Sequence, residues 1–227
     1  MVTAGRDGRG DRRHEPEARL FVAVPLPEAT CAAIGAVVET VRQRLATADA
    51  ESAARGGPAG GRVRWVRMDG LHVTLRFLGG TAEDHLATLS GAVDAAAAMS
   101  SPFEITVAGA GAFPSPARPR ALWLGIVAGD DALANLARRL DDALIALGWD
   151  HEARPFQAHL TLARTDGVRA GPLAAAALGA AAEGLDARFR ADRIVLFRSH
   201  LGGGPARYER VHEALMASPI AAPPEAR

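Results

Sequence analysis

Two short stretches, far apart in the chain, share one pattern of residues that could do chemistry. LHVTLRFL begins at Leu71 and AHLTLAR begins at Ala158, so each contains His, an apolar residue, Thr and Leu. A histidine inside an apolar strand costs free energy unless its polar atoms find partners. Two copies in the same local setting therefore predict one site that is built from two halves.

The spacing within each copy decides what the side chains could do together. On an extended strand, residues two apart point to the same face, so His72 would share a face with Thr74, and His159 with Thr161. A neutral imidazole can take a proton from water, and a protonated one can give a proton to a leaving oxygen. Hydroxyls can donate to the non-bridging oxygens of a phosphate. The set predicts phosphoester hydrolysis by two-histidine acid–base catalysis.

Arginines accompany both motifs, and a guanidinium offers a fork of donors that suits phosphate. Arg76 is four residues past His72, which predicts the same face of the strand. Arg164 ends the second stretch, from which a long side chain could fold back toward the site. The other histidines have simpler interpretations, and we assign no role to His200 or His212.

A metal site is the main competing interpretation of two histidines. A catalytic zinc usually has three protein ligands, and neither motif carries Cys, Asp or Glu at the spacing of strand ligands. The nearest acids, Asp69 and Asp166, lie outside the motifs. We therefore predict neither a metal nor a cofactor. Phe156, just before the second motif, is interpreted as a core residue, with base stacking as the alternative.

Composition limits the class of protein. The chain has 227 residues with 26 basic and 26 acidic side chains, so binding of a nucleic acid would have to be local. Every basic residue is arginine, which excludes Schiff-base lysines and a lysine–nucleotide intermediate. The single cysteine, Cys31, fits a reducing cytosol, and the sequence shows neither a secretory signal nor an apolar run that could span a bilayer. We expect a cytoplasmic monomer without membrane association.

The elements that must position the motifs alternate between strands and helices. Hydrophobic periodicity predicts strands at Arg19–Val24, Val63–Val66, Leu71–Leu78, Phe103–Ala108, Ala121–Val127, Gln157–Ala163, Ala191–Phe197 and Arg207–His212. It predicts helices at Glu28–Ala46, at 82–99 with Thr81 as N-cap, at Asp130–Leu147 with Gly148 as C′ residue, and at Pro172–Glu183.

The segments between and beyond these elements complete the expected organisation. Small and Gly- or Pro-rich residues predict loops at Ala48–Gly61 and Gly109–Arg120. A charged start without periodicity predicts a disordered tail at 1–18, and a Pro/Ala-rich end predicts another at 218–227. Residues 19–217 would form a single bilobal domain, because both halves contain a helix, a histidine strand and another helix.

The motifs and their context resemble the two-histidine phosphoesterase superfamily, and within it the RNA 2′,3′-cyclic phosphodiesterases, historically called 2′-5′ RNA ligases. The similar stretches are RLFVAVPLP near the start, WV followed by LHVTLRFLG, FPSPARPRALWLG, and RPFQAHLTLAR. The resemblance implies an α+β fold of two lobes related by a pseudo-twofold. Each lobe would be a mainly antiparallel sheet with outer helices, and the sheets would face each other across a central groove.

The resemblance also implies roles for particular residues. It places the catalytic pair on His72 and His159, favouring His159 as base for water and His72 as acid for the leaving 3′-oxygen, although the sequence itself leaves their order open. It places phosphate binding on Thr74, Thr161 and Arg164. The implied substrate is RNA with a 2′,3′-cyclic phosphate end, tRNA fragments among them, or a cyclic nucleotide, opened to a 2′-phosphate. The resemblance also implies reversible 2′-5′ RNA ligation without ATP.

Three departures from the family pattern bear on substrate preference more than on reaction type. Ala158 stands where a proline usually precedes the second histidine, residues 67–70 replace a Pro-rich turn, and the Ala48–Gly61 loop is longer than is typical. Two alternatives stay open. The same fold could act on another substrate, such as an ADP-ribose cyclic phosphate or a 2′-5′ oligonucleotide, or the chain could bind RNA ends without catalysis.

Overall fold

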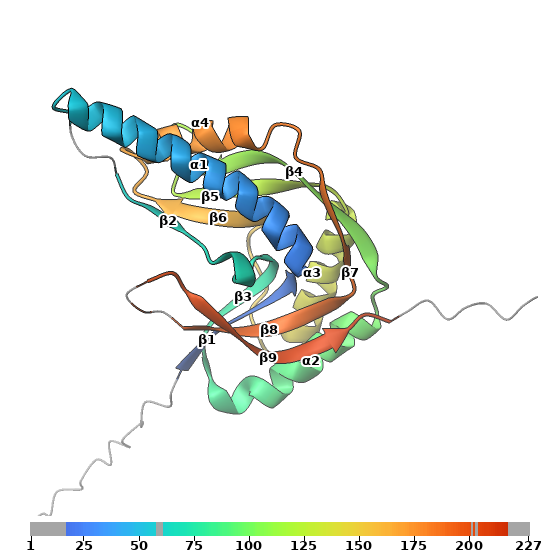
Figure 1. Ribbon diagram of the computed structural model, residues 1–227. Coiled ribbons are helices and arrows are strands. Elements are labelled where there is room, and N and C mark those ends of the chain that lie inside the picture. The colour runs from blue at the N-terminus through green and yellow to red at the C-terminus, as the bar shows by residue number, and fades with distance from the viewer. Residues whose placement is uncertain (1–16, 58–60, 201, 203, 218–227) are drawn as a thin grey trace, which may run out of the picture.

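The structure is a computed structural model, and it describes residues 17–57, 61–200, 202 and 204–217 (Figure 1). Its strands are β1 (Glu17–Pro25), β2 (Val63–Trp65), β3 (His72–Ala82), β4 (Phe103–Phe113), β5 (Ala121–Ala128), β6 (His159–Thr165), β7 (Ala187–Ala191), β8 (Arg193–His200) and β9 (Arg207–Leu215). Its α-helices are α1 (Glu28–Ala54), α2 (Leu86–Ala98), α3 (Asp130–Ile145) and α4 (Gly171–Ala181), and short 3-10 turns lie at η1 (Met68–Gly70) and η2 (Glu83–His85).

The strands form two antiparallel sheets, which confirms the predicted α+β class. The four-stranded sheet has the order β3-β1-β8-β9, and the five-stranded sheet has the order β2-β6-β5-β4-β7. Helices α2 and α3 pack against the first sheet, whereas α1 and α4 pack against the second (Figure 1). The two motif histidines therefore begin strands of different sheets, β3 and β6.

Apolar residues at helical spacing hold the helices on the sheets. In α3 the buried positions Leu133, Leu136, Leu140 and Leu144 recur every three or four residues, so they form one stripe that faces the core. The helix ends at Ile145, two residues before the predicted end, and Gly148 follows with a φ of 91° that is readily adopted only by glycine. The N–H of the next residue, at position 149, donates to the Leu144 carbonyl at 3.0 Å, which satisfies a terminal acceptor of the helix.

The path of the chain weaves the two lobes together. Helix α1 directly follows β1 of the four-stranded sheet, yet it packs against α4 and β7 of the other lobe. Helix α3 follows β5 of the five-stranded sheet, yet it packs against α2 and β3 (Figure 1). The four-stranded sheet takes β1 and β3 from the first part of the chain and β8 and β9 from the last part. Neither lobe is thus a single continuous segment.

Several predicted boundaries are wrong, and glycines explain two of them. The strand predicted to end at Leu78 continues to Ala82, because Gly79, with a φ of 72°, makes a bulge in the pairing with β1 rather than a stop. Thr81 is consequently a buried strand residue and not a helix N-cap. Gly109, with a φ of 68°, plays the same part in β4, so that the predicted loop is strand as far as Phe113.

The other corrections concern the ends of elements. Helix α1 runs on to Ala54, so the predicted loop is helix over most of its first half, in agreement with the high helix propensity of its alanines. Strand β1 begins at Glu17, inside the tail predicted at 1–18, and β7 was not predicted. The rest of that tail, residues 58–60 of the loop, and the tail at 218–227 lie outside the described residues. None of the described helices is both long enough and apolar enough to cross a bilayer.

Candidate active site

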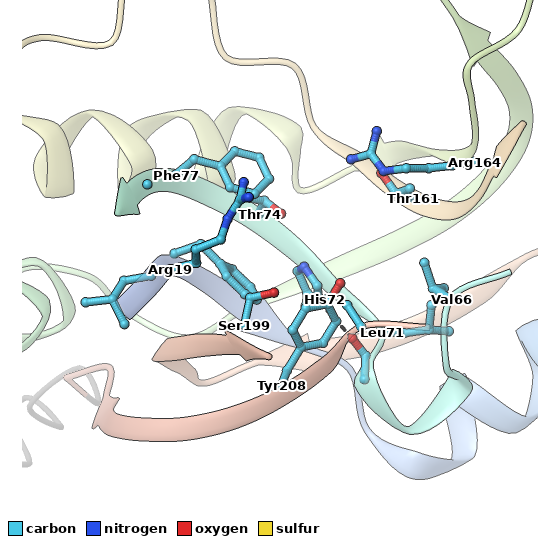
Figure 2. Close-up of a pocket in the computed structure, with 15 residues that line it drawn as sticks. Arg19, Val66, Leu71, His72, Thr74, Phe77, Thr161, Arg164, Ser199 and Tyr208 are labelled. Atoms are coloured by element: carbon cyan, nitrogen blue, oxygen red, sulfur yellow. Dashed lines mark hydrogen bonds between the residues drawn. The ribbon is translucent and has the colours of Figure 1, made fainter. Parts of the chain in front are cut away.

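The two motifs meet at a cavity of about 420 Å³ between the sheets (Figure 2). His72 and Thr74 line it from β3, and Thr161 and Arg164 line it from β6. His159 lies beside this cavity rather than among its lining residues. It precedes Thr161 by two residues on the same face of β6, and it is close enough for its charge to act on His72. The structure thus brings together the five residues singled out in the sequence.

Each motif fixes its histidine by the same local hydrogen bond. His72 Nδ1 lies 2.7 Å from the carbonyl oxygen of Gly70, and His159 Nδ1 lies 2.8 Å from that of Gln157. A carbonyl oxygen can only accept, so each Nδ1 carries the proton and donates it. The neutral rings therefore leave Nε2 with a free lone pair. In both motifs the backbone two residues upstream selects the tautomer that can accept a proton at Nε2.

A β-bulge after each threonine changes which later residue faces the cavity. Thr74 pairs with Ala23 and Arg76 with Val22, so Leu75 is the extra residue in β3. Thr161 pairs with Trp123 and Ala163 with Leu122, so Leu162 is the extra residue in β6. An extra residue reverses the alternation of faces beyond it.

The repeated bulge places the fifth residue after each histidine on the cavity side. That residue is Phe77 in the first motif and Arg164 in the second, and both line the cavity (Figure 2). Phe77 is 59% exposed although it is a large aromatic residue. Arg164 has no hydrogen-bond or ion-pair partner among the described residues. The second motif therefore offers a free cation where the first offers an aromatic ring.

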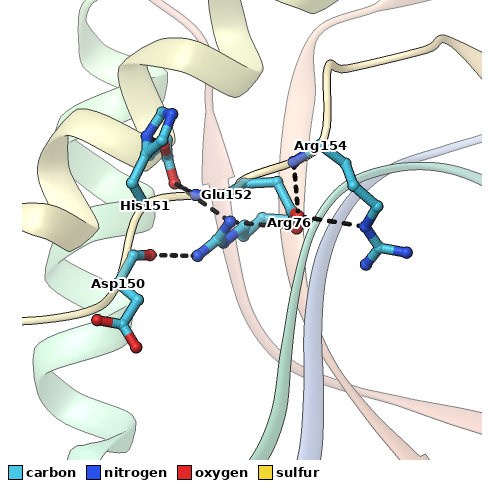
Figure 3. Close-up of polar contacts among 6 residues, drawn as sticks. Arg76, Asp150, His151, Glu152 and Arg154 are labelled. Atoms are coloured by element: carbon cyan, nitrogen blue, oxygen red, sulfur yellow. Dashed lines mark hydrogen bonds and ion pairs between the residues drawn. The ribbon is translucent and has the colours of Figure 1, made fainter.

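The prediction that Arg76 shares a face with His72 is wrong, because the bulge turns Arg76 into the protein interior. Arg76 is 8% exposed, and its guanidinium contacts Asp141 at 3.4 Å and Glu152 at 3.2 Å (Figure 3). It also donates to the Asp150 carbonyl at 2.5 Å. Asp141 belongs to α3, and the other two partners belong to the segment that leads into β6. Arg76 thus joins the strand of the first histidine to the approach of the second.

Aromatic rings surround both motif histidines. The His72 ring lies 4.7 Å from the Phe21 ring and 5.1 Å from the Tyr208 ring, centroid to centroid. The His159 ring lies 5.0 Å from the Phe113 ring and 6.4 Å from the Trp123 ring. Edge or tilted contacts of this kind hold a ring in one orientation.

Burial among these rings lowers the pKa of His72. Loss of solvation is the largest cause, the hydrogen bond to Gly70 opposes it, and the nearby charge of His159 adds to it. The neutral form of His72 is therefore favoured in the free protein. Burial also raises the pKa of Tyr208, which leaves its phenol protonated and able to donate a hydrogen bond into the cavity.

Sequence reasoning missed the aromatic residues around the motifs. Tyr208 is the only tyrosine of the chain and falls in a predicted strand, which is a weak signal. Phe113 and Trp123 lie in a stretch whose only sequence signal is its similarity to the family. Strict alternation does not place Phe77 on the cavity side, because it does not account for the bulge. Phe156 packs against the hydrophobic core, as predicted.

The histidines without an assigned role pair with carboxylates instead of joining the cavity. His200 contacts Glu209 at 2.8 Å, and His212 contacts Asp94 at 2.7 Å. The described residues contain no group of three or more His, Cys, Asp or Glu side chains arranged to hold a metal ion.

Comparisons with known proteins give a consistent result. The model of the 2′-5′ RNA ligase superfamily matches residues 54–203. An RNA 2′,3′-cyclic phosphodiesterase of Geobacillus stearothermophilus is 34% identical over 165 residues, which are 72% of this chain but only 49% of the relative. One of Methanothermobacter thermautotrophicus is 33% identical over 151 residues, 66% of this chain and 73% of the relative.

Solved structures resemble the fold over nearly its whole length. The crystal structure of E. coli LigT complexed with 3′-AMP has a TM-score of 0.61 at 25% identity, with 89% of this chain and 99% of that chain covered. A protein of Thermus thermophilus has a TM-score of 0.64 at 25% identity, with 88% and 98% covered. The two-lobed architecture described above is thus shared with these proteins.

Proposed function

Since this chain belongs to the 2′-5′ RNA ligase superfamily, we propose that it hydrolyses the 2′,3′-cyclic phosphate at the end of an RNA to a 2′-phosphate. Water would attack the phosphorus and lose a proton to one imidazole. The bond from phosphorus to O3′ would break, and the other imidazole would give its proton to O3′. The products are a 2′-phosphate and a 3′-hydroxyl, so atoms and charge balance without a metal or cofactor.

The single observation that supports this proposal most is that two histidines, one lining the cavity and one beside it, are held by the same local hydrogen bond. Each has Nδ1 occupied by a backbone carbonyl and Nε2 free, as acid–base catalysis at a shared phosphate requires. Thr74 and Thr161 would donate to the non-bridging oxygens. Arg164, with no carboxylate partner among the described residues, would neutralise the phosphate charge.

We assign His159 as the base and His72 as the acid, following the family resemblance. The lowered pKa of His72 means that the free protein holds the acid mostly unprotonated. A bound cyclic phosphate brings a negative charge next to this ring, which favours the imidazolium. We therefore propose that substrate binding itself raises the pKa of His72 and that the proton is taken up with the substrate.

The proposal extends to the partner and to a ligation reaction. RNA ends, tRNA fragments among them, would enter the groove between the sheets, and residues 19–217 would form one catalytic domain. With a 5′-hydroxyl in place of water, the same proton transfers would break the bond from phosphorus to O3′ and leave a 2′-5′ linkage without ATP. The relatives from Geobacillus stearothermophilus and Methanothermobacter thermautotrophicus are named RNA 2′,3′-cyclic phosphodiesterases, after the hydrolysis and not the ligation.

Turnover tests the proposal. The full chain is incubated with an oligonucleotide that ends in a 2′,3′-cyclic phosphate and, separately, with 2′,3′-cyclic AMP, and products are identified by mass and phosphorus NMR. We expect a 2′-phosphate. His72→Ala should abolish most turnover, whereas His200→Ala, a histidine paired with Glu209 outside the cavity, should leave it unchanged.

The other outcomes would change the assignment. Tight binding of the oligonucleotide without any product would indicate an RNA-end binder. If only an ADP-ribose cyclic phosphate or a 2′-5′ oligonucleotide yields product, the substrate is of that class and not an RNA end. A 3′-phosphate product would reverse the roles of the histidines or the orientation of the substrate.

A further inference from the structure

Arg64 lies beside Arg164 on the same face of the five-stranded sheet. In the antiparallel pair of β2 and β6, Arg64 is directly opposite Arg164. Side chains of opposed residues point to the same side, with Cβ atoms about 4.5–5.5 Å apart. The alternation of β2 agrees, because Val63 and Trp65 pack against the core while Arg64 between them is exposed. Arg64 is therefore exposed at the rim of the groove.

The two arginines form a pair of like charges that the protein does not neutralise. Neither has a hydrogen-bond or ion-pair partner among the described residues. Like charges directly opposed on neighbouring strands are destabilising, and a guanidinium cannot lose its proton to relieve this. Elsewhere the chain supplies carboxylates to its surface arginines, as Asp186 does for Arg188 at 2.5 Å. The unbalanced pair at the groove is thus suited to an anion that comes from outside.

The chemistry of the proposed substrate indicates which anion this would be. A 2′,3′-cyclic phosphate ends the strand, so every other phosphate of an RNA lies on its 5′ side. Arg164 lies next to Thr161 at the cavity (Figure 2). Arg64 lies one strand farther out, opposite Arg164 in the pairing of β2 with β6. A strand held by its terminal phosphate at the cavity would carry its next phosphate past this rim.

We propose that Arg64 binds the phosphodiester on the 5′ side of the terminal nucleotide, which makes an RNA oligonucleotide, rather than a cyclic mononucleotide, the preferred substrate. This inference rests on the proposed function. Arg64 would bind substrate and take no part in the proton transfers. The value of kcat/KM would therefore depend on Arg64 only when the substrate has a second phosphate. The contribution of Arg64 is electrostatic and weakens as salt increases.

Three substrates isolate the second phosphate: 2′,3′-cyclic AMP, the same nucleotide with a 5′-phosphate, and an oligoadenylate ending in a cyclic phosphate. Arg64→Gln should lower kcat/KM about tenfold for the two substrates with a second phosphate, as expected for one charge-assisted hydrogen bond. The loss for cyclic AMP should be much smaller. Arg64→Lys should recover part of the loss, because it keeps the charge.

The dependence on salt provides an independent readout. One phosphate contact to a single strand contributes about 0.7 to the slope of log affinity against log salt concentration. The slope for the oligoadenylate should therefore be smaller by about this amount in Arg64→Gln than in the wild type. The matched control is Arg44→Gln, an exposed arginine of α1 with no partner among the described residues, which should change neither quantity.

An equal loss on all three substrates, or no loss on any, would overturn the proposal. Loss on the oligoadenylate alone, with an unchanged salt slope, would also overturn it, since Arg64 would then contact a base. If the wild type turns over none of the three substrates, the proposed function fails, and a binding measurement then tests whether Arg64 contacts a phosphate. An oligoadenylate with a 2′-phosphate end should then still bind more tightly than 2′-AMP in an Arg64-dependent manner; the lack of this difference would overturn the subsite as well.

Discussion

Replacing Arg76 by Met should destabilise the fold far more than replacing the exposed Arg154, although both arginines contact the same carboxylate. Arg76 contacts Glu152 at 3.2 Å with a side chain that is 9% exposed, whereas Arg154 contacts it at 3.4 Å with a side chain that is 84% exposed. Loss of Arg76 would also leave Asp141, itself 7% exposed, without its guanidinium.

The burial of the two arginines sets the expected magnitudes. Removing one member of a buried ion pair costs about 3–5 kcal/mol, because the other charge stays desolvated. Removing an exposed pair costs at most about 1 kcal/mol. In a chain of this size, about 1 kcal/mol lowers the melting temperature by roughly 2–4 °C. Arg76→Met should therefore lower it by roughly 6–20 °C, and Arg154→Met by no more than about 4 °C.

The assay is equilibrium unfolding in urea, followed by tryptophan fluorescence and circular dichroism at neutral pH. A third variant, Arg76→Met with Asp141→Asn, should recover part of the loss, since it removes a buried carboxylate that has lost its guanidinium and, among the described residues, keeps an ion-pair contact only with the exposed His151, at 2.6 Å. Similar small losses for Arg76→Met and Arg154→Met would refute the reasoning. So would a double variant that is no more stable than Arg76→Met.

Further predictions concern the chemistry at the cavity. His72→Ala and His159→Ala should each lower the turnover rate by a factor of about 10²–10⁴. The double variant should lose far less than the product of the two factors, because both imidazoles serve the same reaction step. Multiplicative losses in folded variants would contradict joint catalysis by the two histidines. Thr74→Val and Thr161→Val should cost less than loss of a histidine, as measured by kcat at saturating substrate, because each removes only one donor. Excess EDTA should leave turnover intact, and activity that only added zinc restores would refute the mechanism. The pKa of His72 is about 6.5 in the unfolded chain and lower in the folded protein. Between these two pKa values the unfolded chain binds more protons, so the free energy of unfolding should fall on acidification. Urea unfolding of His72→Gln at about pH 7.5 and about pH 5.5 should show a smaller pH dependence than the wild type, and an unchanged dependence would argue against a lowered pKa.

The sequence predicted the placement of the motif residues on their strands better than it predicted the bounds of the elements around them. The motif residues His72, Thr74, His159 and Thr161 are where strict alternation on a strand places them, and alternation holds because nothing interrupts the strands before the threonines. Arg76 was misplaced because a bulge lies one residue after Thr74. The alternation of apolar and polar residues in LHVTLRFL is compatible with a regular strand and with a bulged one, so the sequence pattern does not indicate the bulge.

Glycine caused errors in the other direction. The sequence pattern places strand ends at Gly79 and Gly109, but each adopts a positive φ inside a strand. A bulge and a turn both require such a conformation, and only pairing with a distant strand distinguishes them. The contacts of Tyr208 with His72, and of Phe113 with His159, also join distant segments, which local periodicity does not report.

The exchange of helices between the two lobes bears on how the molecule could be divided. Helix α1 follows β1 but covers the other lobe, and the four-stranded sheet takes its strands from both ends of the chain, so any single cut between β1 and β9 divides this sheet between the two fragments. Neither fragment could then bury its apolar surface by itself. Two fragments expressed together would have to fold on each other, as in split-protein complementation, and their reassociation would rebuild the cavity because β3 and β6 contribute one motif each.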